Sequence, residues 1–216
     1  MAGAVAERVR RYIFDGTDQD LRRLLRISEL SAEMARAAFL RIGSQEGWSA
    51  IDCGCGPLYT RLFLMHQPDP VRTLRRIAGL LRPGGWLVTQ EALRSPPPRS
   101  HPDLEALSGY WDLVYEVLDG AGVPAGAVED LPRSARQAGL EVAGVSGCFL
   151  IMDPELGFEV HAARLAAARE RATRLGIAAR RVDDLVRDIR AAADGGFEWV
   201  SSGFVLDLTL RKPAAP

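Results

Sequence analysis

A short apolar segment that runs directly into closely spaced glycines most constrains the fold of this chain. Residues 48–53 (WSAIDC) suit a buried strand, and they are followed by Gly54-Cys55-Gly56-Pro57, so that the pattern from Asp52 is D-x-G-x-G. Glycines after a strand permit a tight turn and let the main chain approach a nucleotide-like ligand. They can also serve only to turn the chain. The pattern alone therefore leaves a ligand site and a plain turn open.

A strand, a helix and another strand are predicted after this turn. Residues 58–65 (LYTRLFLM) are a second apolar run, and Asp69 is placed to cap a helix that begins at Pro70 and ends at Pro83-Gly84-Gly85. Residues 85–91 (GWLVTQE) form a third apolar run. Two strands joined by a helix predict a parallel pair with a right-handed crossover. The fold class is therefore α/β.

The remaining elements are predicted from apolar periodicity and from glycine and proline positions. Helices are expected within residues 18–40, 103–118, 124–138 and 159–193, the last divided at Gly176, and strands at 140–151 and 203–210, with a loop at 95–102. No linker separates these elements. We therefore expect one domain over residues 1–216.

Charge and cysteine content exclude several classes of partner. The 27 basic and 28 acidic residues give a net charge of -1, so nucleic acid and anionic membranes are not expected partners. Three cysteines cannot form a fully paired disulfide framework, and no His or Cys spacing suits a metal. The apolar runs are shorter than the ~20 residues that cross a bilayer, and arginines interrupt the N-terminal segment. We expect a reduced, cytoplasmic chain.

Three motifs taken in order resemble one enzyme family. D-x-G-x-G from Asp52 is followed by L-x-H-x-x-D-P from Leu64 and by LLRPGGWL from Leu80. This order is similar to class I S-adenosylmethionine-dependent methyltransferases, closest to the small-molecule branch. The resemblance implies a Rossmann-like, seven-stranded sheet with its last strand antiparallel, S-adenosylmethionine over the strand ends, and helical lid segments at residues 1–47, 103–122 and 158–195.

The chain departs from this family after Gly56. The family expects two further βα units there, including the acidic residue for the ribose, before the strand that here begins near Leu58. At ~30 residues a unit, about 60 residues are missing between Gly56 and Leu62. Either the sequence joins two stretches that a disordered segment separates in the whole protein, or half of the cofactor cleft is truly absent. We favour the first explanation, because a parallel strand so close in sequence has no backbone route into the sheet.

The resemblance and the chemistry of the side chains give candidate roles. Cofactor binding is assigned to Asp52, Gly54, Cys55, Gly56, Arg61 and Tyr12, and substrate binding to Phe14, Glu91, Tyr110, Trp111 and Phe149. Arg61 could instead form a surface ion pair, Glu91 could hold a neighbouring helix, and the aromatic residues could be plain core. His66 is the candidate catalytic base, with capping of the strand or helix as its alternative. No role is assigned to His101 or His161.

The predicted function is methyl transfer from S-adenosylmethionine to an O, N or C atom of a small, apolar or aromatic acceptor. Such a displacement needs mainly alignment of the acceptor, the methyl carbon and the leaving sulfur. Two alternatives stay open: a binding protein of the same fold without activity, and an enzyme of this fold that catalyses a cyclisation or rearrangement. The helices within residues 158–195 either cover the cleft or form a homodimer.

Overall fold

The computed structural model describes residues 32–43, 58–124 and 126–214. Two compact units are present: Ala32–Pro96, Ala121–Phe149 and Gly203–Pro216 form a sheet unit, and Pro97–Gly120 and Leu150–Ser202 belong to a helical unit. The predicted strand at 48–53, the glycine turn and the first part of the predicted helix at 18–40 lie outside the described residues. Residues 32–41 are helical.

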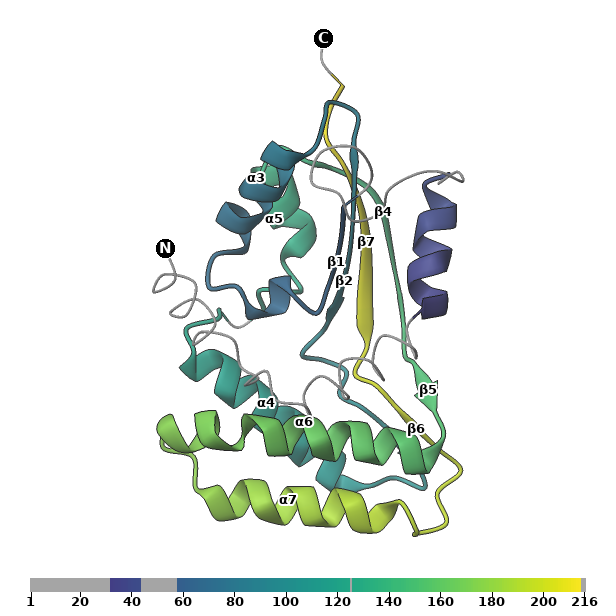
Figure 1. Cartoon of the computed structure of the whole chain (residues 1–216), viewed down its shortest axis with the longest axis vertical. Helices are drawn as coiled ribbons and strands as arrows, with labels where there is room; N and C mark the ends of the chain where they lie inside the picture. Colours follow the sequence, from purple (N-terminus) through teal and green to yellow (C-terminus); the bar gives the residue numbers. More distant parts are fainter. Residues whose placement is uncertain (1–31, 44–57, 125, 215–216) are drawn as a thin grey trace, which may run out of the picture. The chain divides into compact units, whose positions relative to one another are not determined.

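The described residues of the sheet unit form four strands in the order β1-β2-β7-β4. These are β1 (Leu58–Arg61), β2 (Trp86–Ala92), β4 (Glu141–Cys148) and β7 (Val205–Arg211). β1 and β2 are parallel, as predicted, and β7 runs antiparallel to β2 and β4. Two helices, α3 (Pro70–Leu80) and α5 (Leu131–Gln137), lie on one face of this sheet and residues 32–41 on the other (Figure 1). The fold is mixed α/β, and the full seven-stranded arrangement stays a prediction.

Two predictions in the sheet unit are wrong in their extent. The strand that begins at Leu58 ends at Arg61, because Leu62 takes a φ of 45° and the apolar residues after it form a 3-10 helix, η1 (Leu64–His66). The helix expected at 124–138 is only α5, which begins after a turn at Gly126 with a φ of 78°. In both places a residue with a positive φ redirects the chain within the segment expected to be one element.

The start of α3 is the one that Asp69 and Pro70 predict. The Asp69 carboxylate accepts a hydrogen bond from the Arg72 amide at 2.9 Å, and Pro70 fills the first turn. Leu74 and Ala78 are buried, which holds the helix on the unit.

Replacing Asp69 by Ala is expected to lower the free energy of unfolding by about 1 kcal/mol, since the Arg72 amide loses its acceptor. Urea denaturation measures this loss. Asp69→Asn is the matched control, because an asparagine oxygen can still cap the helix. Equal losses in the two variants would show that the cap does not stabilise α3.

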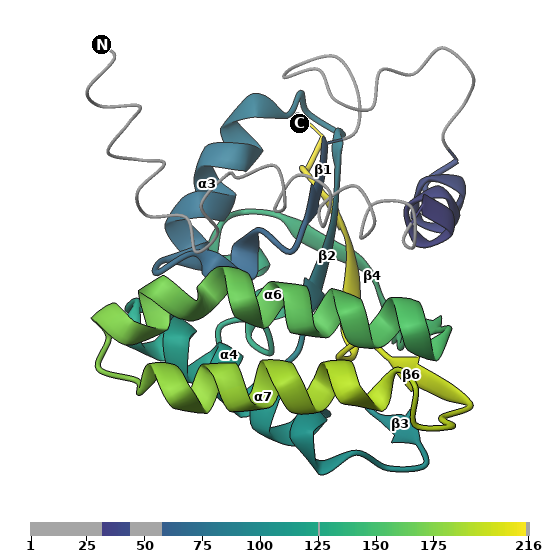
Figure 2. The ribbon, with the colours of Figure 1, turned by 60° about the horizontal axis from the view of Figure 1, so that its bottom comes forward.

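The part of the helical unit that the structure describes combines three helices with a small sheet. The helices are α4 (Glu105–Gly120), α6 (Pro154–Arg174) and α7 (Ala179–Ala192), and the strands β3 (Ser100–His101), β6 (Trp199–Ser201) and β5 (Ile151–Met152) are ordered β3-β6-β5. α6 and α7 lie side by side (Figure 2). Gly176, with a φ of 85°, lies between them, so the predicted division of residues 159–193 is confirmed.

Two further strand predictions are refined. The segment expected as one strand at 140–151 is split, since β4 ends at Cys148 in the sheet unit and β5 pairs with β6 in the helical unit. The loop predicted at 95–102 contains the short strand β3. Among the described helices, none combines the length and the apolar character needed to span a membrane.

Candidate functional site

The carboxyl ends of β1 and β2 bring three predicted site residues into one region of the sheet unit. Because the two strands are parallel, with Arg61 opposite Gln90, their carboxyl ends lie at the same edge of the sheet. Arg61 is the last residue of β1, and η1 begins after Leu62 and Phe63 and ends at His66. Glu91 lies near the end of β2. The strand order thus places Arg61, His66 and Glu91 at one edge.

The Glu91 carboxylate binds the main chain at the start of η1. Its Oε1 accepts hydrogen bonds from the amides of Phe63 at 3.2 Å and Leu64 at 3.0 Å, and its Oε2 accepts one from Met65 at 3.2 Å. The Thr89 hydroxyl donates to Oε1 at 2.9 Å. Three consecutive amides and a hydroxyl therefore point at one buried carboxylate. Of the two predicted roles for Glu91, these contacts support the one that holds a neighbouring helix.

Burial dominates the acidity of this carboxyl group. Glu91 is fully buried, and loss of solvation raises its pKa to about 6, while the bonds from the Leu64, Met65 and Phe63 amides and from Thr89 act to lower it. The group is ionised at neutral pH. Its negative charge is held by amide dipoles, and no charged side chain contributes to the shift.

His66 ends η1 and is only partly buried. Its amide donates to the carbonyl of Phe63 at 3.2 Å, while Leu64 and Met65, the two preceding residues of η1, are buried at 0% and 1% exposure. The imidazole is thus carried by a short helix that is held on one side by packing and on the other by Glu91. Its role as a base stays a prediction.

A buried polar network on the opposite face of the sheet was not predicted from the sequence. The Tyr59 hydroxyl donates to Gln90 Oε1 at 2.7 Å, and Gln90 Nε2 donates to Asp207 Oδ2 at 2.7 Å. Arg41, from the helical residues 32–41, forms an ion pair of 2.8 Å with the same Asp207 oxygen. One sequence feature could have indicated this network. Asp207 interrupts the apolar strand VLDLTL, and burying a charged residue in such a strand is costly unless it is paired.

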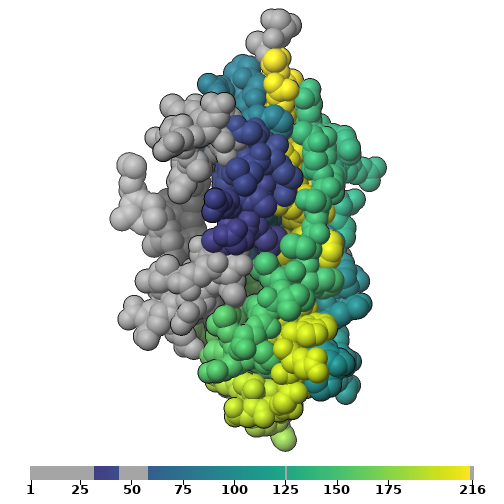
Figure 3. All heavy atoms as spheres, turned by 90° about the vertical axis from the view of Figure 1, so that its right-hand side faces the viewer, coloured from purple at the N-terminus to yellow at the C-terminus, as the bar shows by residue number. Residues whose placement is uncertain are grey.

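The same network fixes residues 32–41 on the sheet. Phe39 contacts Tyr59 with ring centroids 5.5 Å apart, and Figure 3 shows residues 32–41 beside β4 and β7. Burial, and to a lesser extent the charges of Asp207 and Glu91, raise the pKa of Tyr59, whereas Arg61 lowers it. Tyr59 is therefore a neutral hydrogen-bond donor. The network has the contacts of a structural anchor for this helix.

The predicted aromatic substrate residues lie in two different units. Phe149 follows β4 and packs edge-on against Phe204 at 5.3 Å in the sheet unit. Tyr110 and Trp111 lie on α4 of the helical unit with 0% and 2% exposure, and Tyr110 packs against His161 at 4.9 Å. Such contacts support the plain-core alternative for Tyr110 and Trp111. A role in substrate binding stays a prediction for all three.

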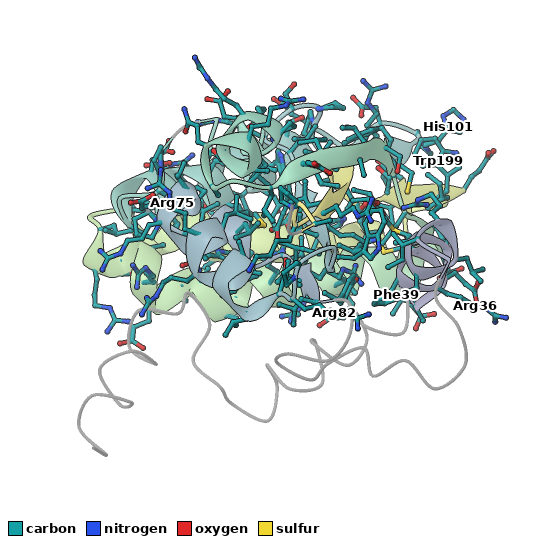
Figure 4. All side chains as sticks on the ribbon, turned by 90° about the horizontal axis from the view of Figure 1, so that it is seen from above. Arg36, Phe39, Arg75, Arg82, His101 and Trp199 are labelled. Carbon is teal, nitrogen blue, oxygen red and sulfur yellow. The ribbon has the colours of Figure 1, made fainter. Side chains whose placement is uncertain are left out.

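The histidines without an assigned role also have structural contacts in the helical unit. His101 stacks on Trp199 at 6.3 Å, and the two side chains lie next to one another in Figure 4. Burial lowers the pKa of His161 to about 4, so this imidazole is neutral, with Nε2 2.9 Å from the Ser201 carbonyl. Within the described part of the chain, no group of three His, Cys, Asp or Glu residues is placed to hold a metal ion.

Most of the predicted cofactor contacts cannot be placed in this geometry. Asp52, Gly54, Cys55, Gly56 and Tyr12 lie outside the described residues, and so does Phe14, which is predicted to bind the substrate. Arg61 is the exception. Its half-buried position at the carboxyl end of a parallel strand fits a guanidinium that binds a carboxylate, such as that of the methionine part of the cofactor.

Comparison with known proteins gives matches among solved structures. No family model and no curated protein matches the chain. Solved structures do match, and the titles among them name methyltransferases, cyclopropane synthases and a [4+2]-cyclase, each less than 25% identical to this chain.

Three of these structures illustrate the identities, coverages and TM-scores of the matches. The [4+2]-cyclase SpnF is 22% identical, with 80% of this chain and 53% of that chain covered and a TM-score of 0.38. A putative methyltransferase from Bacillus halodurans is 16% identical, with coverages of 79% and 68% and a TM-score of 0.42. The cyclopropane synthase MmaA2 from Mycobacterium tuberculosis is 14% identical, with coverages of 74% and 56% and a TM-score of 0.39. The chain thus spans about half the length of the cyclase.

Proposed function

We propose that this chain binds S-adenosylmethionine and transfers its methyl group to an O, N or C atom of a small, apolar or aromatic acceptor. The observation that carries the proposal is the common edge of β1 and β2, where β1 ends at Arg61 and the η1 segment with His66 follows. In open α/β sheets, ligands bind outside the carboxyl ends of parallel strands. The D-x-G-x-G pattern from Asp52 supplies the turn expected to lie beneath such a ligand.

Residues of this chain would bind the cofactor, orient the acceptor and remove its proton. S-adenosylmethionine supplies a methyl group on a sulfonium, so the reaction needs little beyond alignment with the acceptor. Arg61 would bind the methionine carboxylate through two parallel hydrogen bonds. His66 would accept the proton of a hydroxyl or amine acceptor, for which an imidazole is suited near neutral pH. Carbon acceptors of the alkene type need no such base in the first step.

Phe149 and Phe204 support an aromatic or apolar acceptor. Their rings pack edge-on in the sheet unit, and both are partly exposed, so each retains ring surface that could contact a ligand. We include Phe149 in the acceptor site. Asp207 and its network are assigned to holding residues 32–41.

Transfer is tested with S-adenosylmethionine that carries an isotopically labelled methyl group. The chain is incubated with a panel of small phenols, aryl amines and unsaturated fatty acids, and products are identified by mass spectrometry. A product with the mass increment of one labelled methyl group is expected. Cofactor binding with no labelled product would contradict transfer and favour the binding protein, and an unlabelled rearranged product would favour the cyclisation alternative.

The intact mass of the purified chain is measured in the same preparation. A mass near 23.5 kDa identifies the protein under test as the 216-residue chain, without the predicted additional βα units. A larger mass shows that the preparation contains the extra segment, and the transfer result then applies to that longer protein.

A further inference from the structure

The segment between β1 and α3, which carries His66, contains one residue in an unusual backbone conformation. Leu62 has a φ of 45°, a region that favours glycine, and its amide donates to the Gln90 carbonyl at 2.8 Å. A leucine in this region is strained and persists where neighbouring contacts hold it. The turn from strand into η1 is therefore stabilised from outside the segment.

The outside contact is Glu91. A 3-10 helix leaves its first amides without carbonyl partners, and a residue at the helix start normally supplies a side-chain cap. Phe63 at that position cannot, and no side chain within the segment caps η1. Glu91 reaches across from β2 and accepts the amides of Phe63, Leu64 and Met65.

The connection from Glu91 to His66 is short and rigid. Met65 immediately precedes His66, and the His66 amide is itself bonded to the Phe63 carbonyl. Met65 and His66 are thus part of the same 3-10 turn. Leu64 and Met65 are buried, so packing holds this turn in place. Displacing the Phe63–Met65 amides must displace the main chain of His66.

The Glu91 carboxylate is itself held in one orientation. The Thr60 hydroxyl donates to Thr89 Oγ1 at 2.8 Å, and the Thr89 hydroxyl donates to Glu91 Oε1. A carboxylate rather than an amide is needed, since both oxygens accept from main-chain amides. A glutamine would place its NH2 group against one of these donors.

We infer that Glu91 is a positioning residue, which fixes the η1 turn by its carboxylate and thereby sets where the His66 imidazole lies. The inference rests on the proposed function for its catalytic consequence, but its geometric content can be tested without any substrate. Glu91 was predicted as a possible substrate contact. In the inferred role it acts on the acceptor only through His66.

The first test compares Glu91→Gln with the unchanged chain by NMR. Amide exchange of Phe63, Leu64 and Met65 is expected to rise about tenfold or more relative to the other amides of the sheet unit, and the His66 Cε1–H signal is expected to shift. The signals of His101 and His161, in the helical unit, serve as internal references. Glu141→Gln is the matched control, because Glu141 is an exposed glutamate of β4 in the same unit. Unchanged exchange and an unchanged His66 signal in Glu91→Gln would overturn the inference.

The second test is a double-variant cycle with His66→Ala in the labelled-transfer assay. Glu91→Gln is expected to lower kcat about tenfold with little change in the KM for S-adenosylmethionine, as expected when a base is displaced. If Glu91 acts through His66, the double variant loses no more activity than His66→Ala alone. Multiplied losses would overturn the inference, because they would show a separate effect of Glu91.

The remaining outcomes are also decisive. If no transfer occurs at all, the proposed function fails, and the NMR comparison still decides whether Glu91 positions His66. If Glu91→Gln does not fold, exchange in the unchanged chain decides: protection of the Phe63–Met65 amides equal to that of the β2 amides supports the inference. Exchange as fast as in exposed loops overturns it.

Discussion

Glu91→Ala is expected to lower the free energy of unfolding by about 3–5 kcal/mol. The variant leaves three buried or partly buried amides and the Thr89 hydroxyl without the acceptor that they share, at 2.9–3.2 Å in the unchanged chain. A cavity the size of a carboxylate adds to the loss. Urea denaturation of the variant measures the change, and Glu141→Ala, at an exposed glutamate, is expected to stay within about 0.5 kcal/mol.

The pH dependence of stability identifies the same group. The pKa of Glu91 is about 6 in the folded chain, above its ordinary value of 4.5, so the folded state binds the proton more tightly than the unfolded state does. Glu91 therefore contributes stability that is present below pH 4.5 and is lost as the pH rises through about 6. The shift corresponds to about 2 kcal/mol.

Glu91→Gln removes this titration and is the comparison to make. As the pH rises from about 4.5 to 7, the unchanged chain is expected to lose about 2 kcal/mol of unfolding free energy relative to Glu91→Gln. Other carboxyl groups titrate in both proteins and cancel. A difference that stays flat, or that moves in favour of the unchanged chain, would contradict a buried carboxyl group with a raised pKa.

Asp52→Asn is expected to weaken S-adenosylhomocysteine binding by about 10- to 100-fold. A carboxylate that receives a hydrogen bond from a charged or polar ligand group is worth about 1.5–3 kcal/mol, and the amide retains the shape without the charge. Isothermal titration calorimetry measures the change. Asp69→Asn makes the same substitution at the cap of α3 and is expected to leave the affinity unchanged. Equal affinities for Asp52→Asn and the unchanged chain would exclude Asp52 from the cofactor site.

The parts of the fold that could be predicted are those with local signals. The pair Asp69-Pro70 predicted the start of α3, and Pro83-Gly84-Gly85 predicted its end and the strand β2 that follows. Gly176 predicted the division between α6 and α7. Each signal is a backbone preference of one or two residues, so it can be read without knowing what the chain packs against.

The parts that could not be predicted depend on contacts between distant residues. The apolar run after Leu58 suited a longer strand, and its change into η1 depends on Glu91, a residue of another strand. The bond between Gln90 and Asp207 joins residues that are far apart in sequence and meet only through the β2–β7 register. Hydrophobic pattern indicates which residues are buried, but it does not say which buried polar groups will pair.

The same distinction between local signals and contacts of distant residues applies to the candidate site. The parallel order of β1 and β2 was predicted, and it brought Arg61, His66 and Glu91 to one edge of the sheet. The contacts of Glu91 with the main chain support its alternative role of holding the neighbouring helix, which the sequence left open beside substrate contact. Tyr110 and Trp111 were predicted from their residue type and from the lid position that the family resemblance implies, and these signals do not separate a pocket wall from a core.

Calorimetric titration of the unchanged, folded chain with S-adenosylhomocysteine tests the central claim most directly. If the carboxyl ends of the parallel strands and the glycine turn form a cofactor site, the chain binds one equivalent saturably, and addition of the ligand raises its thermal midpoint. If a folded chain of verified mass gives neither saturable heat nor a shift in the midpoint, no such site exists and the proposed methyl transfer is contradicted.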